Sequence, residues 1–150
     1  MIYLNDLNVI FAGCAKNCEK YLPDVLNNIQ SYSSLFKNSF KIIVENGSTD
    51  DTKKILKKHE NDESILHFRD DLNLIEHRTI RLALARNLII KEIKNNQKLK
   101  DFDLLIMLDF DDRGIFKVEE NNLIKAIEFL FSKNNIAAVF GNQPDLYFDM

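Results

Sequence analysis

The sequence predicts an α/β protein built on an open, mostly parallel β-sheet with helices on both faces. Short apolar runs rich in β-branched residues alternate with longer runs of helical periodicity, which is the pattern of such a sheet. The chain has 150 residues, of which 45% are hydrophobic, enough for one sizeable core. Only 4 glycines and 2 prolines are present, which disfavours a turn-rich all-β or low-complexity chain. We therefore expect residues 1–150 to form a single domain.

Five strands and four helices are predicted in alternation. The strands are short apolar runs, and the fourth is a continuous one, of the kind buried on both faces of a sheet. The predicted strands are Asn8–Cys14, Phe40–Glu45, Ser64–Phe68, Phe102–Leu108 and Ile136–Phe140. The helices carry apolar residues at spacings of three and four. They cover Glu19–Phe36, a segment capped by Ser48 or Asp50 and reaching about His59, His77–Lys94, and Glu119–Lys133.

Charge and composition disfavour several classes of function. The net charge is −3 and no basic block is present, so the chain does not resemble a general nucleic-acid binder. No apolar run approaches the roughly 20 residues of a membrane-spanning helix, and the first residues lack the features of a signal peptide. Cys14 and Cys18 are too few for a disulfide framework. We expect a cytoplasmic protein without a transmembrane segment.

Polar residues follow three of the predicted strands. They are the segments Gly13–Asn17, Glu45–Asp50 and Asp109–Asp112. Ligands of parallel α/β sheets bind beyond the carboxyl ends of the strands. We therefore expect these three clusters to lie at one edge of the sheet and to form the binding site.

The third cluster places three carboxylates within four residues. Residues two apart in an extended chain point the same way, so Asp109 and Asp111 can converge, while Asp112 points elsewhere or begins a turn. Converging carboxylates repel unless a cation bridges them, and Mg²⁺ or Mn²⁺ would use such oxygens together with substrate phosphates. We take Asp109, Asp111 and Asp112 as candidate metal ligands. The alternative is a solvated acidic turn.

A phosphatase of the haloacid-dehalogenase type is a competing interpretation of the same acidic string. In those enzymes the two aspartates lie near the start of the chain and are usually followed by Thr or Val. Here they lie late and precede Arg113 and Gly114. This order disfavours a phosphatase.

The turn after the second strand carries an acid that a simple turn does not explain. A capped turn accounts for Gly47, Ser48 and Asp50, but not for Glu45 at the end of an apolar strand. A carboxylate or amide at that position can accept hydrogen bonds from a nucleobase. Guanine offers two donors to one carboxylate and uracil offers one, so Glu45 is mildly better suited to guanine.

The third helix carries arginines that can face the same edge. Arg78 and Arg86 are eight residues apart, about two helical turns, and can share a face. Arg86 would contact a diphosphate or the aspartate cluster, with Asn87 hydrogen-bonding nearby, since a guanidinium suits phosphate and carboxylate. The alternative is that these arginines face solvent, which we expect for Arg81.

Four motifs in this order resemble the GT-A glycosyltransferases. VENGSTDDT is similar to their V-D-D-G-S-T-D-x-T turn, which contacts the nucleoside of a nucleotide sugar, and LIMLDFDD is similar to their metal-binding strand end. The helix segment RTIRLALARN resembles the RxxxLAxxRN helix of the fungal capsule-associated α-mannosyltransferase group, and family 2 enzymes have a similar A-R-N. FGNQPDLYFDM is similar to an N-x-x-x-x-Y-Y-D stretch of some bacterial and viral relatives.

The resemblance implies a GT-A, Rossmann-like fold and a glycosyltransferase that moves a hexosyl group from a UDP- or GDP-linked sugar to a hydroxyl acceptor such as a glycan. Asp109 and Asp111 would act in catalysis through Mn²⁺ or Mg²⁺, with Asp111 the principal ligand and Asp109 contacting ribose or sugar or helping the metal. The nucleotide sugar would be bound by Gly13, which lets base or ribose approach the backbone, by Glu45, Asn46, Ser48 and Asp50 of the turn, and by Arg78, Arg86 and Asn87.

Two departures from the family pattern shape the expectation. Glu45 and Asn46 replace the usual Asp-Asp, which leaves the base open. The sequence stops at Met150, where the acceptor-binding half of such enzymes begins, so we expect a donor-binding half with little or no transfer by itself. The alternatives are a non-catalytic nucleotide-sugar-binding module and a sugar-phosphate nucleotidyltransferase. The latter would need a glycine-rich basic loop where this chain has GCAKN.

Overall fold

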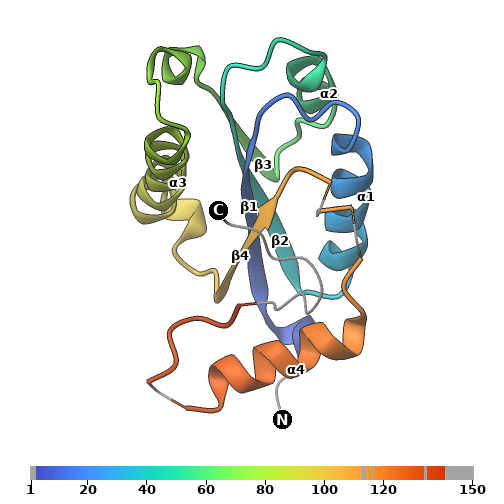
Figure 1. Cartoon of the computed structure of the whole chain (residues 1–150). Coiled ribbons are helices and arrows are strands. Elements are labelled where there is room, and N and C mark those ends of the chain that lie inside the picture. The colour runs from blue at the N-terminus through green and yellow to red at the C-terminus, as the bar shows by residue number, and fades with distance from the viewer. Residues whose placement is uncertain (1–2, 113, 116, 134, 141–150) are drawn as a thin grey trace. The chain divides into compact units, whose positions relative to one another are not determined.

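The computed structural model describes residues 3–112, 114–115, 117–133 and 135–140. They fall into two compact units, one spanning Tyr3–Lys117 and the other including the described residues from Val118 onward. The larger unit holds the sheet and three of the labelled helices, and the smaller unit holds the helix α4 (Figure 1). Residues 141–150, and with them nearly all of the FGNQPDLYFDM motif, lie outside the described residues.

The larger unit alternates strands with helices as the sequence predicts. Its strands are β1 (Asn8–Ala15), β2 (Asn38–Glu45), β3 (Ser64–Phe68) and β4 (Leu104–Asp109). Its α-helices are α1 (Leu22–Ser33), α2 (Thr52–Lys58) and α3 (Arg78–Asn95), and its short 3₁₀ segments are η1 (Leu4–Asp6), η2 (Asp70–Leu74) and η3 (Gln97–Leu99). Among the described residues the four strands pair in parallel in the order β3-β2-β1-β4. The predicted α/β class with a parallel sheet is confirmed.

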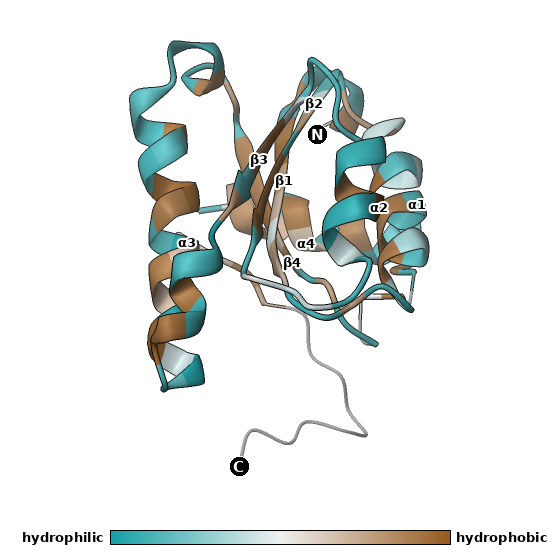
Figure 2. Cartoon of the chain, turned by 90° about the horizontal axis from the view of Figure 1, so that it is seen from above, coloured by the Kyte–Doolittle hydropathy of each residue, from teal (hydrophilic) through white to brown (hydrophobic). Residues whose placement is uncertain are grey.

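Helices cover both faces of this sheet. Figure 2 shows α3 on one side and α1 with α2 on the other. The alternation of side chains along β1 explains the two layers, because successive residues of a strand point to opposite faces. Ile10 belongs to a buried cluster with Ala85 and Ile89 of α3, whereas the ring of Phe11 lies 6.3 Å from that of Tyr32 in α1. Each fully buried aliphatic or aromatic side chain of this kind contributes about 1.5–3 kcal/mol.

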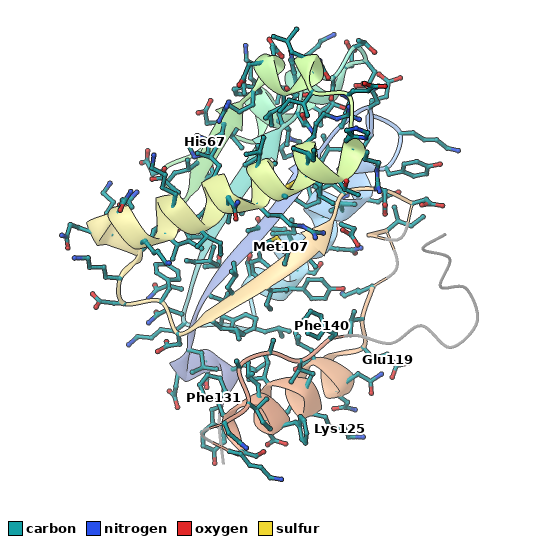
Figure 3. The ribbon with its side chains drawn as sticks, turned by 60° about the vertical axis from the view of Figure 1, so that its left-hand side comes forward. His67, Met107, Glu119, Lys125, Phe131 and Phe140 are labelled. Carbon is teal, nitrogen blue, oxygen red and sulfur yellow. The ribbon has the colours of Figure 1, made fainter. Side chains whose placement is uncertain are left out.

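The prediction that the fourth strand is buried on both faces is wrong. β4 lies at an edge of the described sheet, and Leu105 and Met107 keep 36% and 37% of their surface exposed (Figure 3 labels Met107). Register with Ile10 and Ala12 places these two residues on the face that α3 covers. Since α3 packs on the central strands β1 and β2, its cover over β4 is incomplete.

A polar contact ties α3 to the opposite edge strand. His67 of β3, labelled in Figure 3, has its Nε2 atom 3.3 Å from Oε2 of Glu92 in α3, and both side chains are about three-quarters buried. His67 thus connects β3 to α3.

The smaller unit contains α4 (Glu120–Phe131), close to the predicted helix, with Ile127 buried. The predicted strand Ile136–Phe140 is wrong, because these described residues have no regular secondary structure and Val139 and Phe140 are exposed. A strand exists through its hydrogen-bonded ladder, and an apolar run alone does not provide a partner. In the described part of the chain, no helix is both long and apolar enough to cross a bilayer.

Candidate functional site at the carboxyl edge of the sheet

The parallel pairing brings three strand ends together. Ala15 and Glu45 are register partners at the ends of β1 and β2, and Cys14 of β1 pairs with Asp109, the last residue of β4. The glycine-containing, turn and acidic segments that the sequence singled out therefore lie at one edge. This is the edge at which parallel α/β sheets bind their ligands.

The loops after β1 and β2 are tied to each other by six hydrogen bonds that backbone N–H groups of described residues donate. Five of these bonds end on side chains of the partner loop, so the two loops behave as one element. The bonds run from Asn46 N to Ala15 O (2.9 Å), Asn17 N to Ser48 Oγ (2.9 Å), Cys18 N to Thr52 Oγ1 (2.9 Å), Glu19 N to Asp50 Oδ2 (3.1 Å), Thr49 N to Asn17 Oδ1 (2.8 Å) and Asp51 N to Glu19 Oε2 (2.8 Å).

Ser48 and Asp50, which the sequence assigned to nucleotide binding, are part of this connection. Ser48 is buried, and Asp50 also accepts a hydrogen bond from Thr52 N at 3.0 Å, at the start of α2. Burial works to raise the pKa of Asp50, but hydrogen bonds from Thr52 and Glu19 outweigh it and hold the pKa below its ordinary value. Both side chains thus accept hydrogen bonds that fix the loop.

Glu45 is a fully buried acid whose carboxylate closes its own turn. Its two oxygens accept hydrogen bonds from Gly47 N (3.2 Å) and Ser48 N (2.5 Å), and Oε2 lies 3.9 Å from the ammonium of Lys53. Lys53 also pairs with Asp70 of η2. The structure therefore explains why an acid stands at this strand end. The Glu45 carboxylate accepts hydrogen bonds from the backbone N–H groups of the turn that follows it.

A second connection reaches the turn from η2. Gly47 has a φ of 65°, which favours glycine, and its carbonyl accepts a hydrogen bond from Nδ2 of Asn73 at 2.7 Å. The Oδ1 atom of Asn73 in turn accepts a hydrogen bond from the ammonium of Lys16 in the loop after β1. Sequence reasoning placed Lys16 in the Gly13–Asn17 segment without giving it a role, and it missed Asn73, because no motif links a residue of η2 to a turn 26 positions earlier.

Asn46, next to Gly47, has an unpaired acceptor. The residue is 6% exposed, and its buried Oδ1 atom has no hydrogen-bond partner among the described residues. A buried polar oxygen without a partner costs free energy, so it is a position at which a ligand's N–H group would be stabilised.

Gly13 is required by the neighbouring strand. A Cβ atom there would lie 2.5 Å from the backbone oxygen of Leu108 in β4 and 3.3 Å from the ring of Phe110. The close approach that we predicted for Gly13 is therefore occupied by protein: β4 and the buried Phe110 lie against it.

The acidic cluster is exposed and has a cation beside it. Nη2 of Arg86 lies 3.8 Å from Oδ1 of Asp109, whose side chain is 68% exposed. Phe110 is buried between the exposed Asp109 and Asp111, as expected for residues that alternate in direction, and Asp112 is also exposed. In the described part of the chain no three His, Cys, Asp or Glu side chains are grouped closely enough to hold a metal ion by themselves.

The remaining predicted residues of α3 are exposed. Arg78 is its first residue, and Asn87 follows Arg86 on the outer part of the helix. The expectation that Arg81 faces solvent is wrong. Its Nη1 atom donates to the carbonyls of Ile75 (2.6 Å) and Glu76 (2.8 Å), so Arg81 fixes the segment that leads from η2 into α3.

The Cys14 thiol lies near the charges of Arg86 and Asp109, and both charges affect its pKa. Burial raises the pKa of the Cys14 thiol to about 11, the Arg86 guanidinium acts to lower it, and the Asp109 carboxylate acts to raise it. We expect alkylation of Cys14 by iodoacetamide, in a Cys18→Ala background, to increase with pH up to about 11.

Removing the cation should slow that reaction. Arg86→Gln takes away the charge that favours the thiolate, so the pKa rises further and the alkylation rate at pH 9 falls, tenfold for each unit of pKa. Arg78→Gln is the matched control and should leave the pH profile unchanged. An unchanged profile in Arg86→Gln would mean that Arg86 does not approach Cys14 in solution.

Comparison with known proteins agrees with this fold. The profile of glycosyl transferase family 2 matches residues 13–140, which include all three strand-end clusters. The chain therefore belongs to glycosyl transferase family 2. The crystal structure of S. aureus TarS 1-349 is similar in fold, with a TM-score of 0.53 and 17% sequence identity over 83% of this chain. The match covers 32% of that chain. A comparison with curated protein sequences found no match.

Proposed function

We propose that this chain forms the donor-binding part of a metal-dependent glycosyltransferase that moves a hexosyl group from a UDP- or GDP-linked sugar to a hydroxyl acceptor. The observation that carries the proposal is the edge itself. An unpaired buried acceptor on Asn46 follows β2, and an exposed carboxylate pair, Asp109 and Asp111, lies at the end of β4, the parallel strand on the other side of β1. The likeness of α3 to the fungal α-mannosyltransferase group is part of this proposal and supports a hexose donor.

At the nucleoside end, we assign base contact to Asn46 and a positioning role to Glu45. The carboxylate of Glu45 is buried and both of its oxygens accept backbone hydrogen bonds, whereas Oδ1 of Asn46 has a free acceptor site. An imide N–H of uracil or the N1–H of guanine would satisfy that acceptor. Because Glu45 is engaged in its turn, its carboxylate no longer favours guanine over uracil.

At the phosphate end, the residues fit the divalent ion that the family resemblance implies. Mg²⁺ and Mn²⁺ prefer oxygen ligands, and Mg²⁺ commonly uses one or two carboxylates with substrate phosphates rather than an all-protein cage. Asp109 and Asp111, with Asp112 next to them, provide such oxygens at an exposed position. When bound, the ion would neutralise charge on the leaving diphosphate. Arg86, beside Asp109, supplies a second positive charge at this position.

The test is metal-dependent nucleotide binding. We expect UDP or GDP with Mn²⁺ to raise the free energy of unfolding by about 2.7 kcal/mol at a ligand concentration of ~100 times Kd, and UMP or GMP to do so less. Asp111→Asn should remove the effect of Mn²⁺ on nucleotide affinity, because the substitution removes one of the two negative charges of the Asp109 and Asp111 carboxylates. Thermal shift and calorimetric titration measure both.

Asp62→Asn is the matched control, because Asp62 is an exposed carboxylate just before β3, away from the carboxyl edge. It should behave as the parent does. Equal Mn²⁺ effects in the parent and Asp111→Asn would exclude Asp111 as a ligand. A parent protein that binds nucleotide without any effect of metal would support the solvated acidic turn instead.

A further inference from the structure

Lys16, in the loop after β1, is a half-buried cation at the carboxyl edge. Its ammonium donates a hydrogen bond to Oδ1 of Asn73, and Nδ2 of Asn73 donates to the carbonyl of Gly47 at 2.7 Å. The ammonium is thus held two hydrogen bonds from the turn that carries Asn46 and its unpaired oxygen.

Lys16 differs from the nearby charged side chains because its hydrogen-bond partner, the amide of Asn73, is neutral. Lys53 pairs with Glu45 and Asp70, Arg69 pairs with Asp71, and Arg86 lies beside Asp109. Among the described ion pairs none involves Lys16, whose contact is with an amide oxygen. A partly desolvated ammonium bound to an amide gains more from an anion than from that amide, because charge-assisted hydrogen bonds are about twice as strong as neutral ones.

We propose that Lys16 binds a phosphate oxygen of the donor nucleotide, and that Asn73 is a positioning residue that holds the ammonium at the edge until the nucleotide arrives. This inference rests on the proposed function and adds to it a phosphate contact from the nucleotide side, separate from the acidic cluster after β4. No bond forms or breaks in the step: the ammonium exchanges an amide acceptor for a phosphate acceptor.

The test compares nucleotides with and without phosphates. Calorimetric titration of the full chain in Mn²⁺ is carried out with UDP and uridine, and with GDP and guanosine. Lys16→Met should weaken binding of the diphosphate about 10- to 100-fold, the range expected for a hydrogen bond to a charged group, and leave nucleoside affinity unchanged. Lys16→Arg should retain most of the diphosphate affinity, since it keeps the charge.

Two further variants separate contact from general loop structure. Lys20→Met is the control, because the ammonium of Lys20 lies over the ring of Tyr21, 5.1 Å from its centroid, and should have no effect on either ligand. Asn73→Ala should also lower the ratio of diphosphate affinity to nucleoside affinity, but by a smaller factor than Lys16→Met does. The double variant with Lys16→Met should lower that ratio no further than Lys16→Met does, because Asn73 acts through Lys16.

The outcomes distinguish this inference from the function on which it rests. The parent protein is expected to bind UDP and GDP more tightly than their nucleosides. If Lys16→Met keeps this preference undiminished, Lys16 does not contact the phosphates, and the proposed function stands. If Lys16→Met weakens nucleoside and diphosphate equally, Lys16 shapes the loop and the inference is also overturned. A parent that binds none of the four ligands contradicts both.

Discussion

Replacing Glu45 by Gln is expected to lower the free energy of unfolding by about 2–4 kcal/mol. The buried carboxylate accepts hydrogen bonds from the N–H groups of Gly47 and Ser48. A glutamine of the same shape offers one acceptor oxygen and an NH₂ group, so one of those N–H groups would face another donor. Urea unfolding followed by circular dichroism measures the change.

Glu60→Gln provides the matched control, since Glu60 is exposed just after α2 and its substitution should change stability by less than about 0.5 kcal/mol. The result also decides between the two interpretations of Glu45. Direct base reading predicts that Glu45→Gln keeps its stability and loses more affinity for GDP than for UDP. A destabilised protein whose remaining folded fraction binds both nucleotides with equal losses supports the positioning role.

Replacing Gly13 by Ala is expected to cost about 3 kcal/mol of stability, near the upper end of the effect of overpacking a core. The added methyl group would lie 2.5 Å from the carbonyl oxygen of Leu108, and a backbone atom of a paired strand cannot move away as a flexible side chain can. Relief would require β4 to separate from β1. Chemical unfolding of the purified variant measures the loss.

The background Phe110→Leu identifies the atom that causes the strain. The Phe110 ring would be 3.3 Å from the new methyl group, a contact that a smaller side chain relieves, but the Leu108 oxygen would remain. Gly13→Ala should therefore cost nearly as much in Phe110→Leu as in the parent. A cost below about 0.5 kcal/mol in either background would show that β1 and β4 are not this close in solution.

The predicted strands and helices of the larger unit were recovered because their signals are local. The run Phe40–Glu45 is apolar and β-branched, and Ser64–Phe68 coincides with β3 as predicted. Parallel pairing then follows from the alternation of strands and helices, since a crossover helix returns the chain to the same end of the sheet. The position of the candidate site at that end follows in the same way.

The failures concern contacts that the hydrophobic periodicity of the sequence does not indicate. Hydrophobicity shows that Met107 and Val139 are apolar, but not which element covers them or whether a ladder forms, so the burial of β4 and the strand at Ile136–Phe140 were predicted wrongly. Arg81 has the composition of a surface residue, yet it binds two backbone carbonyls that the preceding turn of chain brings to it.

The α/β class, the order of elements in the larger unit and the edge at which the polar segments gather follow from the amino-acid sequence alone, because periodicity and strand-end position are properties of neighbouring residues. The contacts that those polar side chains make are visible only in the folded chain. Glu45 holds its own turn, and Asn73 links Lys16 to Gly47. Hydrogen bonds between segments depend on distances that the chain acquires when it packs, and no pattern along the chain encodes them.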